Sequence, residues 1–361
     1  MTSKINVTRA FLPPLDEYMA QVKRAYDNAW LTNRGELVLE LESKLKHHLD
    51  IDHILLMNNG TIPLQILMHL LGDKGEVITT PFSYVATTAS IVWEGCIPVF
   101  VDIEPEYFTI NPSHIEAAIT SRTKGILATH VFGNPCDIEA LEEIAARHGL
   151  WIMYDAAHAF GVKYKGKSIF RFGTASTCSF HATKLFHTGE GGALFTNNEE
   201  LRKLSYYSHN FGHSGPLTFH GLGINGKISE LQSAMGLSVL PYIKEIFEGR
   251  RKVVEIYRKE LSGSRVQFMK LREGTEWNYS YFPITFETEA ELLKCEAALN
   301  AMQIFPRRYF YPSLNTLEYT GKFSCPVSED IASRILCLPL YKELTEAEVL
   351  KISRAIREIL N

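Results

Sequence analysis

The sequence predicts an α/β protein with a mostly parallel sheet flanked by helices, followed by a smaller α+β domain. Two observations favour this class. Between about residues 53 and 240, short apolar runs typical of buried strands alternate with segments of helical apolar spacing. After about residue 261 that alternation stops. We therefore expect a large domain at 16–240 and a small domain at 241–361, on which residues 1–15 pack.

Composition indicates an ordinary globular protein. The 361 residues are 45% hydrophobic and 22% charged, with a net charge of −4 and no basic field that would favour nucleic acid. The six cysteines form no C-x-x-C pair, so we expect reduced thiols and predict no metal site. The N-terminus lacks an apolar signal core, and no apolar run is long enough to span a bilayer. We therefore expect a cytoplasmic protein without a membrane partner.

The first part of the chain is expected to hold two helices, at residues 16–30 and 36–49. The turn between them, Leu31-Thr-Asn-Arg-Gly35, contains Asn33. A plain helix-to-helix turn, with Gly35 supplying a positive φ, explains this pattern without any ligand.

A strand at 53–57 leads through Gly60 into a helix that ends near Leu71. Thr61 is the expected N-cap of this helix, and Pro63 is tolerated in its first turn. Free N–H groups and the positive dipole end of a helix N-terminus favour a phosphate. A capped helix with no ligand explains the pattern equally well.

The alternation then continues along the chain. Strands are expected at 76–80, 97–101, 125–131, 151–154 and 175–180, and helices after Pro81 and at 112–119 and 138–147. Ligands of parallel sheets bind beyond the C-terminal ends of the strands. Five candidate residues fall at or just past such ends, namely Gly60, Tyr84, Asp155, Ser179 and Lys184.

Lys184 is the candidate catalytic residue. It follows the buried strand at 175–180 in the segment Ser179-Phe-His-Ala-Thr-Lys184. Desolvation there lowers the pKa of the amine and allows it to attack a carbonyl, although most lysines are solvated surface residues. Asp155 favours the chemical role, because a carboxylate that keeps a pyridine nitrogen protonated, near a Schiff-base lysine, suits pyridoxal 5′-phosphate (PLP). His158, one turn further, could contact the phenolic oxygen of PLP or Asp155, or be a core histidine.

Residues 221–226 spell G-x-G-x-x-G. We reject a dinucleotide site there, because no strand is expected before it and the βαβ setting is missing. Helices are expected next at 228–240 and 241–261. Further strands at 267–271 and 281–286 and helices at 289–302 and 346–360 complete the predicted small domain.

Cations and aromatic side chains cluster in Arg307-Arg-Tyr-Phe-Tyr-Pro312. Arg307, Arg308 and Tyr309 suit a nucleotide diphosphate and its base, and a surface loop is the alternative.

The segments Asp155-Ala-Ala-His-Ala-Phe-Gly161, Ser179-Phe-His-Ala-Thr-Lys184 and Glu190-Gly-Gly192 resemble those of the DegT/DnrJ/EryC1/StrS sugar aminotransferases, and the likeness covers nearly the whole chain. The resemblance implies the fold-type-I architecture of aspartate aminotransferase, with PLP on Lys184 and L-glutamate as amino donor. It also implies cofactor contacts of Gly60, Thr61, Tyr84, Asp155, His158, Ser179 and Asn225, and a substrate site near Asn33. Because the residue matching Asn225 reaches the phosphate of the other subunit, a homodimer with shared active sites is expected.

Within this family, the combination of motifs is most similar to enzymes that aminate C4 of dTDP-4-keto-6-deoxy-D-glucose for O-antigen or other surface polysaccharides. Enzymes that aminate C3 more often have glutamine in place of His158. A C3-aminotransferase or a UDP-sugar enzyme is the alternative. Sugar dehydratases of the family replace the lysine, and catalytically silent PLP-fold sensors lose the lysine or the aspartate. This chain keeps both Lys184 and Asp155.

Overall fold

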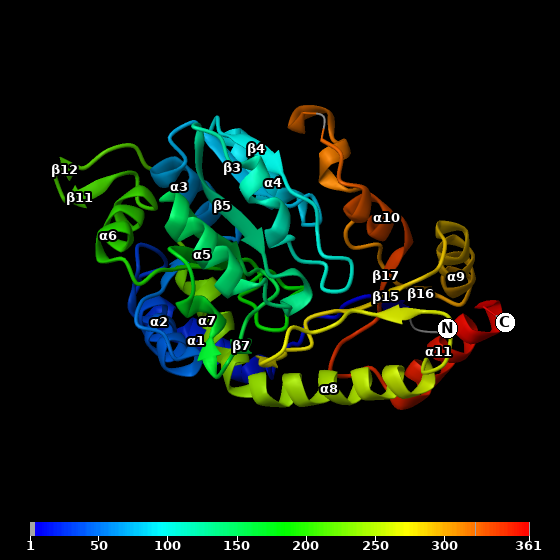
Figure 1. Cartoon of the computed structure of the whole chain (residues 1–361). Coiled ribbons are helices and arrows are strands. Elements are labelled where there is room, and N and C mark those ends of the chain that lie inside the picture. The colour runs from blue at the N-terminus through cyan, green and yellow to red at the C-terminus, as the bar shows by residue number, and fades with distance from the viewer. Residues whose placement is uncertain (1–3, 322, 361) are drawn as a thin grey trace.

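A computed structural model describes residues 4–321 and 323–360, so residues 1–3 and 361 at the ends of the predicted segments lie outside it, as does residue 322. Figure 1 shows a large sheet wrapped by helices, and a smaller group of strands and helices that the long helix α8 joins to it. Both ends of the described part of the chain lie beside the smaller group. In the part that the structure describes, no helix is long and apolar enough to cross a membrane.

The large sheet is mostly parallel, as the sequence predicts. Its strand order is β2-β10-β9-β6-β5-β3-β4, and only β10 runs antiparallel to its neighbours among the strands described. The strands are β2 (Leu55–Met57), β3 (Glu76–Thr79), β4 (Ile97–Phe100), β5 (Thr123–Thr129), β6 (Trp151–Asp155), β9 (Ala175–Ser179) and β10 (Gly192–Phe195).

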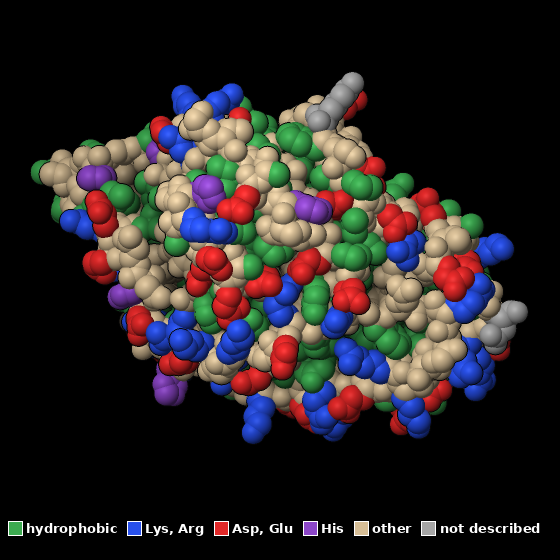
Figure 2. Space-filling model, viewed as in Figure 1, with side chains coloured by type: hydrophobic (Ala, Val, Ile, Leu, Met, Phe, Trp, Pro, Cys, Tyr) green, Lys and Arg blue, Asp and Glu red, His purple; other side chains and the backbone are tan. Residues whose placement is uncertain are grey.

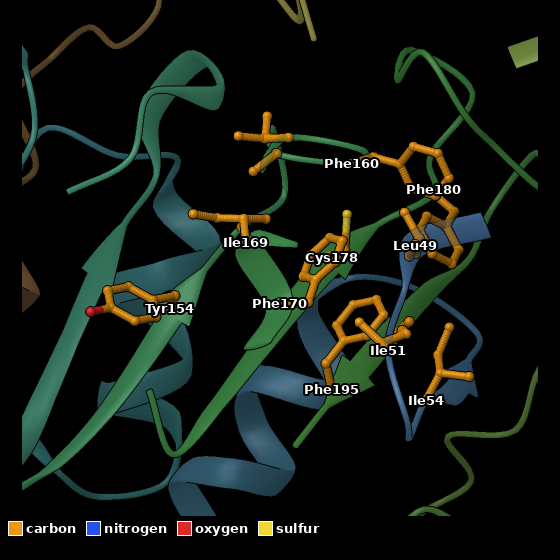
Figure 3. Close-up of a cluster of buried hydrophobic side chains, with 14 of the residues drawn as sticks. Leu49, Ile51, Ile54, Tyr154, Phe160, Ile169, Phe170, Cys178, Phe180 and Phe195 are labelled. Atoms are coloured by element: carbon orange, nitrogen blue, oxygen red, sulfur yellow. The ribbon is translucent and has the colours of Figure 1, made fainter. Parts of the chain in front are cut away.

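Helices cover both faces of this sheet. They are α1 (Leu15–Asp27), α2 (Glu36–Leu49), α3 (Thr61–Leu71), α4 (Val85–Trp93), α5 (Ile138–His148), α6 (Glu199–Ser208) and α7 (Glu230–Val239). Side chains alternate along β6: Ile152 and Tyr154 pack into a core with α2, α5 and α7, and Met153 packs into a second core with α3, α4 and α6. This period of two is what a strand buried on both faces requires. Figure 3 shows the first core, where Phe170 and Phe195 stack with ring centroids 3.9 Å apart.

Helix α8 (Ile243–Glu260) contributes to two cores. Ile243 and Ile246 belong to the core of the large sheet, whereas Val253 and Tyr257 belong to a separate core around the small sheet. The small sheet is antiparallel, in the order β13 (Gln267–Phe268), β15 (Phe282–Thr285) and β17 (Ile335–Leu338). The division into domains near residue 240 stays a prediction, which the separate cores support.

Helices α9 (Glu289–Ala301), α10 (Pro326–Arg334) and α11 (Glu346–Leu360) complete the smaller group. The N-terminal strand β1 (Ile5–Asn6) pairs in parallel with β16 (Ile304–Phe305), and Ile5 joins the core around the small sheet. Strand β1 thus packs on the smaller group, whereas Phe11 packs against the core of the large sheet, so the packing of residues 1–15 on the small domain stays a prediction.

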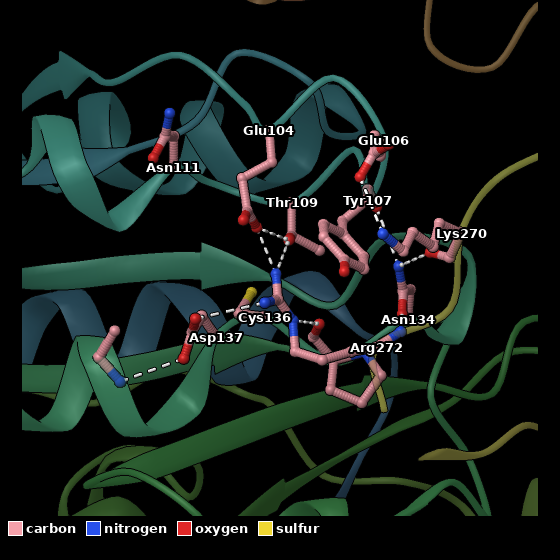
Figure 4. A network of polar contacts seen from close by, with 12 residues as sticks. Glu104, Glu106, Tyr107, Thr109, Asn111, Asn134, Cys136, Asp137, Lys270 and Arg272 are labelled. Carbon is pink, nitrogen blue, oxygen red and sulfur yellow. Dashed lines mark hydrogen bonds and ion pairs between the residues drawn. The ribbon is translucent and has the colours of Figure 1, made fainter. Parts of the chain in front are cut away.

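A network around Arg272 ties the segment before Tyr281 to the large sheet (Figure 4). Its guanidinium pairs with Glu104 and, at 3.3 Å, with Asp137, and donates to the Pro135 carbonyl oxygen at 3.2 Å. Asn134 Nδ2 donates to the Lys270 carbonyl oxygen at 2.9 Å. These contacts hold the segment before Tyr281 against the large sheet.

On the face of the molecule in Figure 2, cationic and acidic side chains are interspersed.

Two expectations about the positions of helices and strands are wrong. Residues 112–119 form no α-helix but two 3₁₀ turns, Pro112–His114 and Glu116–Ala118, because Ile115 alone is buried and no apolar stripe anchors a longer helix. A short strand, β12 (Thr218–Phe219), does precede residues 221–226. It pairs antiparallel with β11 (His213–Gly215) in an exposed hairpin, so the setting for a dinucleotide site is still missing.

Candidate active site

A cavity of about 260 Å³ opens at the C-terminal ends of the parallel strands. It is where the topology of such a sheet places a ligand. Nine of the residues singled out from the sequence line it: Gly60, Thr61, Tyr84, Asp155, His158, Ser179, Lys184, Arg307 and Tyr309. Their roles stay predictions, but the structure brings them together.

Lys184 lies in a tight turn after β9, where its N–H donates to the His181 carbonyl oxygen at 2.8 Å. Its Nζ donates to the Tyr281 hydroxyl at 3.5 Å and lies 5.5 Å from that ring's centroid. Burial of the amine lowers the pKa of Lys184, which nearby Tyr309 and Asp155 partly oppose. The lowered pKa increases the neutral fraction of the amine, which is the form that attacks a carbonyl.

Asp155 is the last residue of β6 and is buried. Its Oδ2 accepts a hydrogen bond from Thr87 Oγ1 at 2.6 Å, and its Oδ1 accepts one from the Ala157 N–H at 3.1 Å. Burial raises the pKa of Asp155, while these hydrogen bonds and the charge of Lys184 lower it. The carboxylate is therefore oriented by two donors and lines the same cavity as the Lys184 amine.

His158 is held as a neutral donor. Its Nδ1 accepts the Phe132 N–H at 3.2 Å, and its ring lies parallel to those of Phe132 and Phe310 at 6.0 and 5.7 Å. Burial lowers the pKa of His158 well below its ordinary value. The hydrogen bond to Nδ1 assigns the ring proton to Nε2. No hydrogen bond joins His158 to Asp155 among the described residues, so the contact with Asp155 considered from the sequence is not formed.

The start of α3 packs against the end of β9. Gly60 occupies the N-cap position, and the prediction of Thr61 as N-cap is wrong. Asn59 Oδ1 instead accepts the N–H groups of Thr61 and Ile62 at 2.8 and 2.9 Å, because its side chain folds back onto the first turn. A Cβ at Gly60 would lie 2.7 Å from that of Ser179, so glycine is needed for this close approach.

Tyr281 is a site residue that the sequence did not single out. It is buried, its ring lies 4.7 Å from that of His158 and 5.3 Å from that of Tyr309, and burial raises its pKa to about 12. Its phenol therefore stays protonated beside Lys184. From the sequence it is one apolar position in a predicted strand, which carries no signal of function.

Three predicted residues do not line the cavity. Asn33 lines a separate hollow of about 430 Å³ with Tyr206 and His213. Asn225 accepts a hydrogen bond from Lys227 Nζ at 2.8 Å in the loop after the β11–β12 hairpin. Arg308 donates to Glu289 at 2.6 Å and to the Ser333 carbonyl oxygen at 2.7 Å.

Comparison with known proteins agrees with this geometry. The sequence profile of the DegT/DnrJ/EryC1/StrS aminotransferase family matches residues 15–357. The chain is 41% identical over 367 residues to a dTDP-4-amino-4,6-dideoxy-D-glucose transaminase of Shigella dysenteriae, covering 99% of this chain and 100% of that protein. It is 38% identical to an enzyme of the same name from Escherichia coli, covering 98% of each.

Solved structures show the same fold. The crystal structure of DesI in the presence of its TDP-sugar product superposes with a TM-score of 0.94 at 31% identity, covering 99% of this chain and 93% of DesI. Enzymes of this family work with PLP, and the cavity offers what PLP needs: a buried carboxylate, a desolvated lysine and a helix N-terminus. The protein therefore belongs to the DegT/DnrJ/EryC1/StrS aminotransferase family and is a PLP-dependent aminotransferase.

Proposed function

We propose that the protein transfers the amino group of L-glutamate to dTDP-4-keto-6-deoxy-D-glucose, forming dTDP-4-amino-4,6-dideoxy-D-glucose. The observation that carries the chemistry is the meeting of Lys184 and Asp155 in one cavity at the strand ends. The relatives from Shigella dysenteriae and Escherichia coli, both matched over essentially their full length, support the choice of sugar. The product would enter the synthesis of O-antigen or another surface polysaccharide.

The residues that line the cavity suit the parts of PLP. Asp155 would pair with the pyridine nitrogen. Gly60 and Thr61 at the start of α3, with Ser179 at the end of β9, would hold the phosphate. His158 Nε2–H would donate to the phenolic oxygen, and Tyr84 would cover a face of the ring. When bound, PLP supplies an electron sink for the carbon that loses its proton.

Lys184 is the residue that moves the proton. Its neutral Nζ would take the proton from the α-carbon of the donor, and return a proton to the acceptor carbon in the second half of the reaction. The Tyr281 hydroxyl, 3.5 Å away, would orient the amine without competing as a base, because its own pKa is raised. Arg307 and Tyr309 line the mouth and would contact the phosphates and base of the nucleotide.

We infer that two copies of the chain share each active site. The β11–β12 hairpin and the loop after it expose Leu217, Phe219 and Leu222 by 92%, 65% and 72%. Apolar side chains gathered in this way favour a protein interface. Asn225 follows in the same loop and would reach the phosphate site of the second copy, beside which Asn33 would lie.

A mixing experiment tests the shared site. Lys184→Ala and Asn225→Asp are each expected to be inactive, the second because a carboxylate would repel the cofactor phosphate. Mixing and refolding the two should restore up to about a quarter of the activity, because half of the dimers are hybrids with one intact site. No recovery in verified hybrids would contradict the sharing.

The six cysteines are buried free thiols, which supports a cytoplasmic location.

The activity itself is tested by NMR of the product formed from L-glutamate and dTDP-4-keto-6-deoxy-D-glucose. We expect a new amine at C4 of the sugar. An amine at C3, or turnover only with a UDP-linked sugar, would refute the proposed substrate. Failure to convert any keto-sugar while glutamate is still deaminated would refute the sugar class.

A further inference from the structure

Asp155 ends a row of three buried hydroxyl groups. Thr87 Oγ1 lies 2.6 Å from Asp155 Oδ2, Ser83 Oγ lies 2.7 Å from Thr87 Oγ1, and Thr129 Oγ1 lies 3.0 Å from Ser83 Oγ. All of these side chains are buried. The sheet register explains how the row forms, since Thr129 is the residue of β5 directly opposite Asp155 of β6.

Counting protons sets the direction of the row. Each hydroxyl carries one proton, and an ionised carboxylate only accepts. Thr87 donates its proton to Asp155, so Ser83 must donate to Thr87, and Thr129 donates to Ser83. All three dipoles therefore point toward the carboxylate. Hydrogen bonds aligned in this way polarise one another, and the one that ends on a charge is the strongest.

We propose that Thr87, Ser83 and Thr129 are positioning residues that hold Asp155 ionised and oriented for the pyridine nitrogen of the cofactor. The proposal rests on the role of Asp155 in the proposed function, and adds the groups that maintain that role.

The charged and titratable groups around Asp155 show why the row matters. Burial raises the pKa of Asp155, and the Thr87 hydrogen bond leads the influences that lower it, ahead of the Ala157 N–H and the charge of Lys184. The other titratable neighbours are uncharged, because burial raises the pKa of the Cys178 thiol and lowers that of His158. Lys184 must be neutral before it takes up a proton, so its positive charge supports Asp155 during only part of the turnover. The hydroxyl row and the Ala157 N–H are the supports that remain throughout.

The test is the pH dependence of cofactor binding. As the pH falls, Asp155 becomes protonated and its pairing with the pyridine nitrogen is lost. Thr87→Val keeps the side-chain shape but removes the hydrogen-bond donor. Asp155 should then take up its proton at a higher pH. We expect the acid midpoint of PLP binding, measured by equilibrium dialysis and the absorbance of bound PLP, to move up by about one pH unit.

Thr88→Val is the matched control. Thr88 lies beside Thr87 in α4 and is equally buried, but its Oγ1 has no hydrogen-bond partner within the described residues. This variant should leave the midpoint unchanged. Thr87→Ser keeps a hydroxyl donor, so its midpoint should match that of the unaltered protein. Ser83→Ala should shift the midpoint upward by less than Thr87→Val does. Thermal melts of the apoproteins check that each variant folds.

Asp155→Asn distinguishes the role of the hydroxyl row from the role of Asp155 itself. If the row acts through the carboxylate, Thr87→Val should cause no further shift in the Asp155→Asn background. Equal midpoints for Thr87→Val and Thr88→Val, with an altered Asp155→Asn profile, would overturn the hydroxyl row alone. PLP binding by Asp155→Asn that matches the unaltered protein at every pH would overturn the assigned role of Asp155 itself.

Discussion

Removing the Arg272 side chain should destabilise the protein far more than removing an exposed arginine with as many carboxylate partners. Arg272 is only 11% exposed and pairs with Glu104 and Asp137, which are 20% and 34% exposed. Arg272→Ala would leave both acids without their cation. Breaking a buried pair costs about 3–5 kcal/mol, and the partial exposure of these acids reduces this to about 2–4 kcal/mol.

Arg251 on α8 is the internal comparison. It also pairs with two carboxylates, Glu248 and Glu255, but all three side chains are at least 41% exposed. Arg251→Ala should therefore cost much less stability than Arg272→Ala, because water screens an exposed ion pair. Both losses are to be measured by urea unfolding followed by circular dichroism, with the apoprotein at one protein concentration. Removing the stranded acid as well, in Arg272→Met with Glu104→Met, should recover part of the loss.

Equal losses of stability in Arg272→Ala and Arg251→Ala would refute this role of the Arg272 network. A Glu104→Met change that adds to the loss instead of relieving it would refute it as well. Either result would mean that the crossing segment before Tyr281 is held by apolar packing and backbone hydrogen bonds, and not by this network.

Three further outcomes are expected. Lys184→Ala should abolish transamination while its far-ultraviolet circular dichroism stays unchanged, and normal turnover would refute its role. Gly60→Ala should weaken PLP binding at least about tenfold, because its Cβ would lie 2.7 Å from that of Ser179. Gly166→Ala strains a turn with φ +76° but has open space at its Cβ, so it should lower stability slightly and bind PLP normally. Burial lowers the pKa of His130 to about 3, so the folded state resists its protonation and loses stability as the pH falls from about 6.5 toward 3. His130→Asn should flatten that part of the stability curve, and an unchanged slope in urea titrations at successive pH values would contradict the assignment.

Much of the lining of the candidate site was predictable because it follows from strand ends. Gly60, Asp155, Ser179 and Lys184 each come at the end of an apolar run or soon after it, and parallel strands bring their C-terminal ends to one edge. Periodicity also located the helices that have a clear apolar stripe: α2 and α11 begin and end where they are predicted. The helix predicted at 112–119 does not form, because its one buried side chain does not make an apolar stripe.

Other features depend on contacts between distant parts of the chain. Tyr281 reaches Lys184 across 97 residues, and Thr129 meets Ser83 across 46, so no local pattern marks either pair. The cap of α3 was missed for a local reason, because Asn59 and Thr61 are both good capping residues and only the backbone geometry chooses between them. Sequence periodicity reports which face of an element is buried. Which residues then meet across that buried face is decided by how the elements pack, and that is where the hydroxyl row, the Arg272 network and the tyrosine beside the lysine arise.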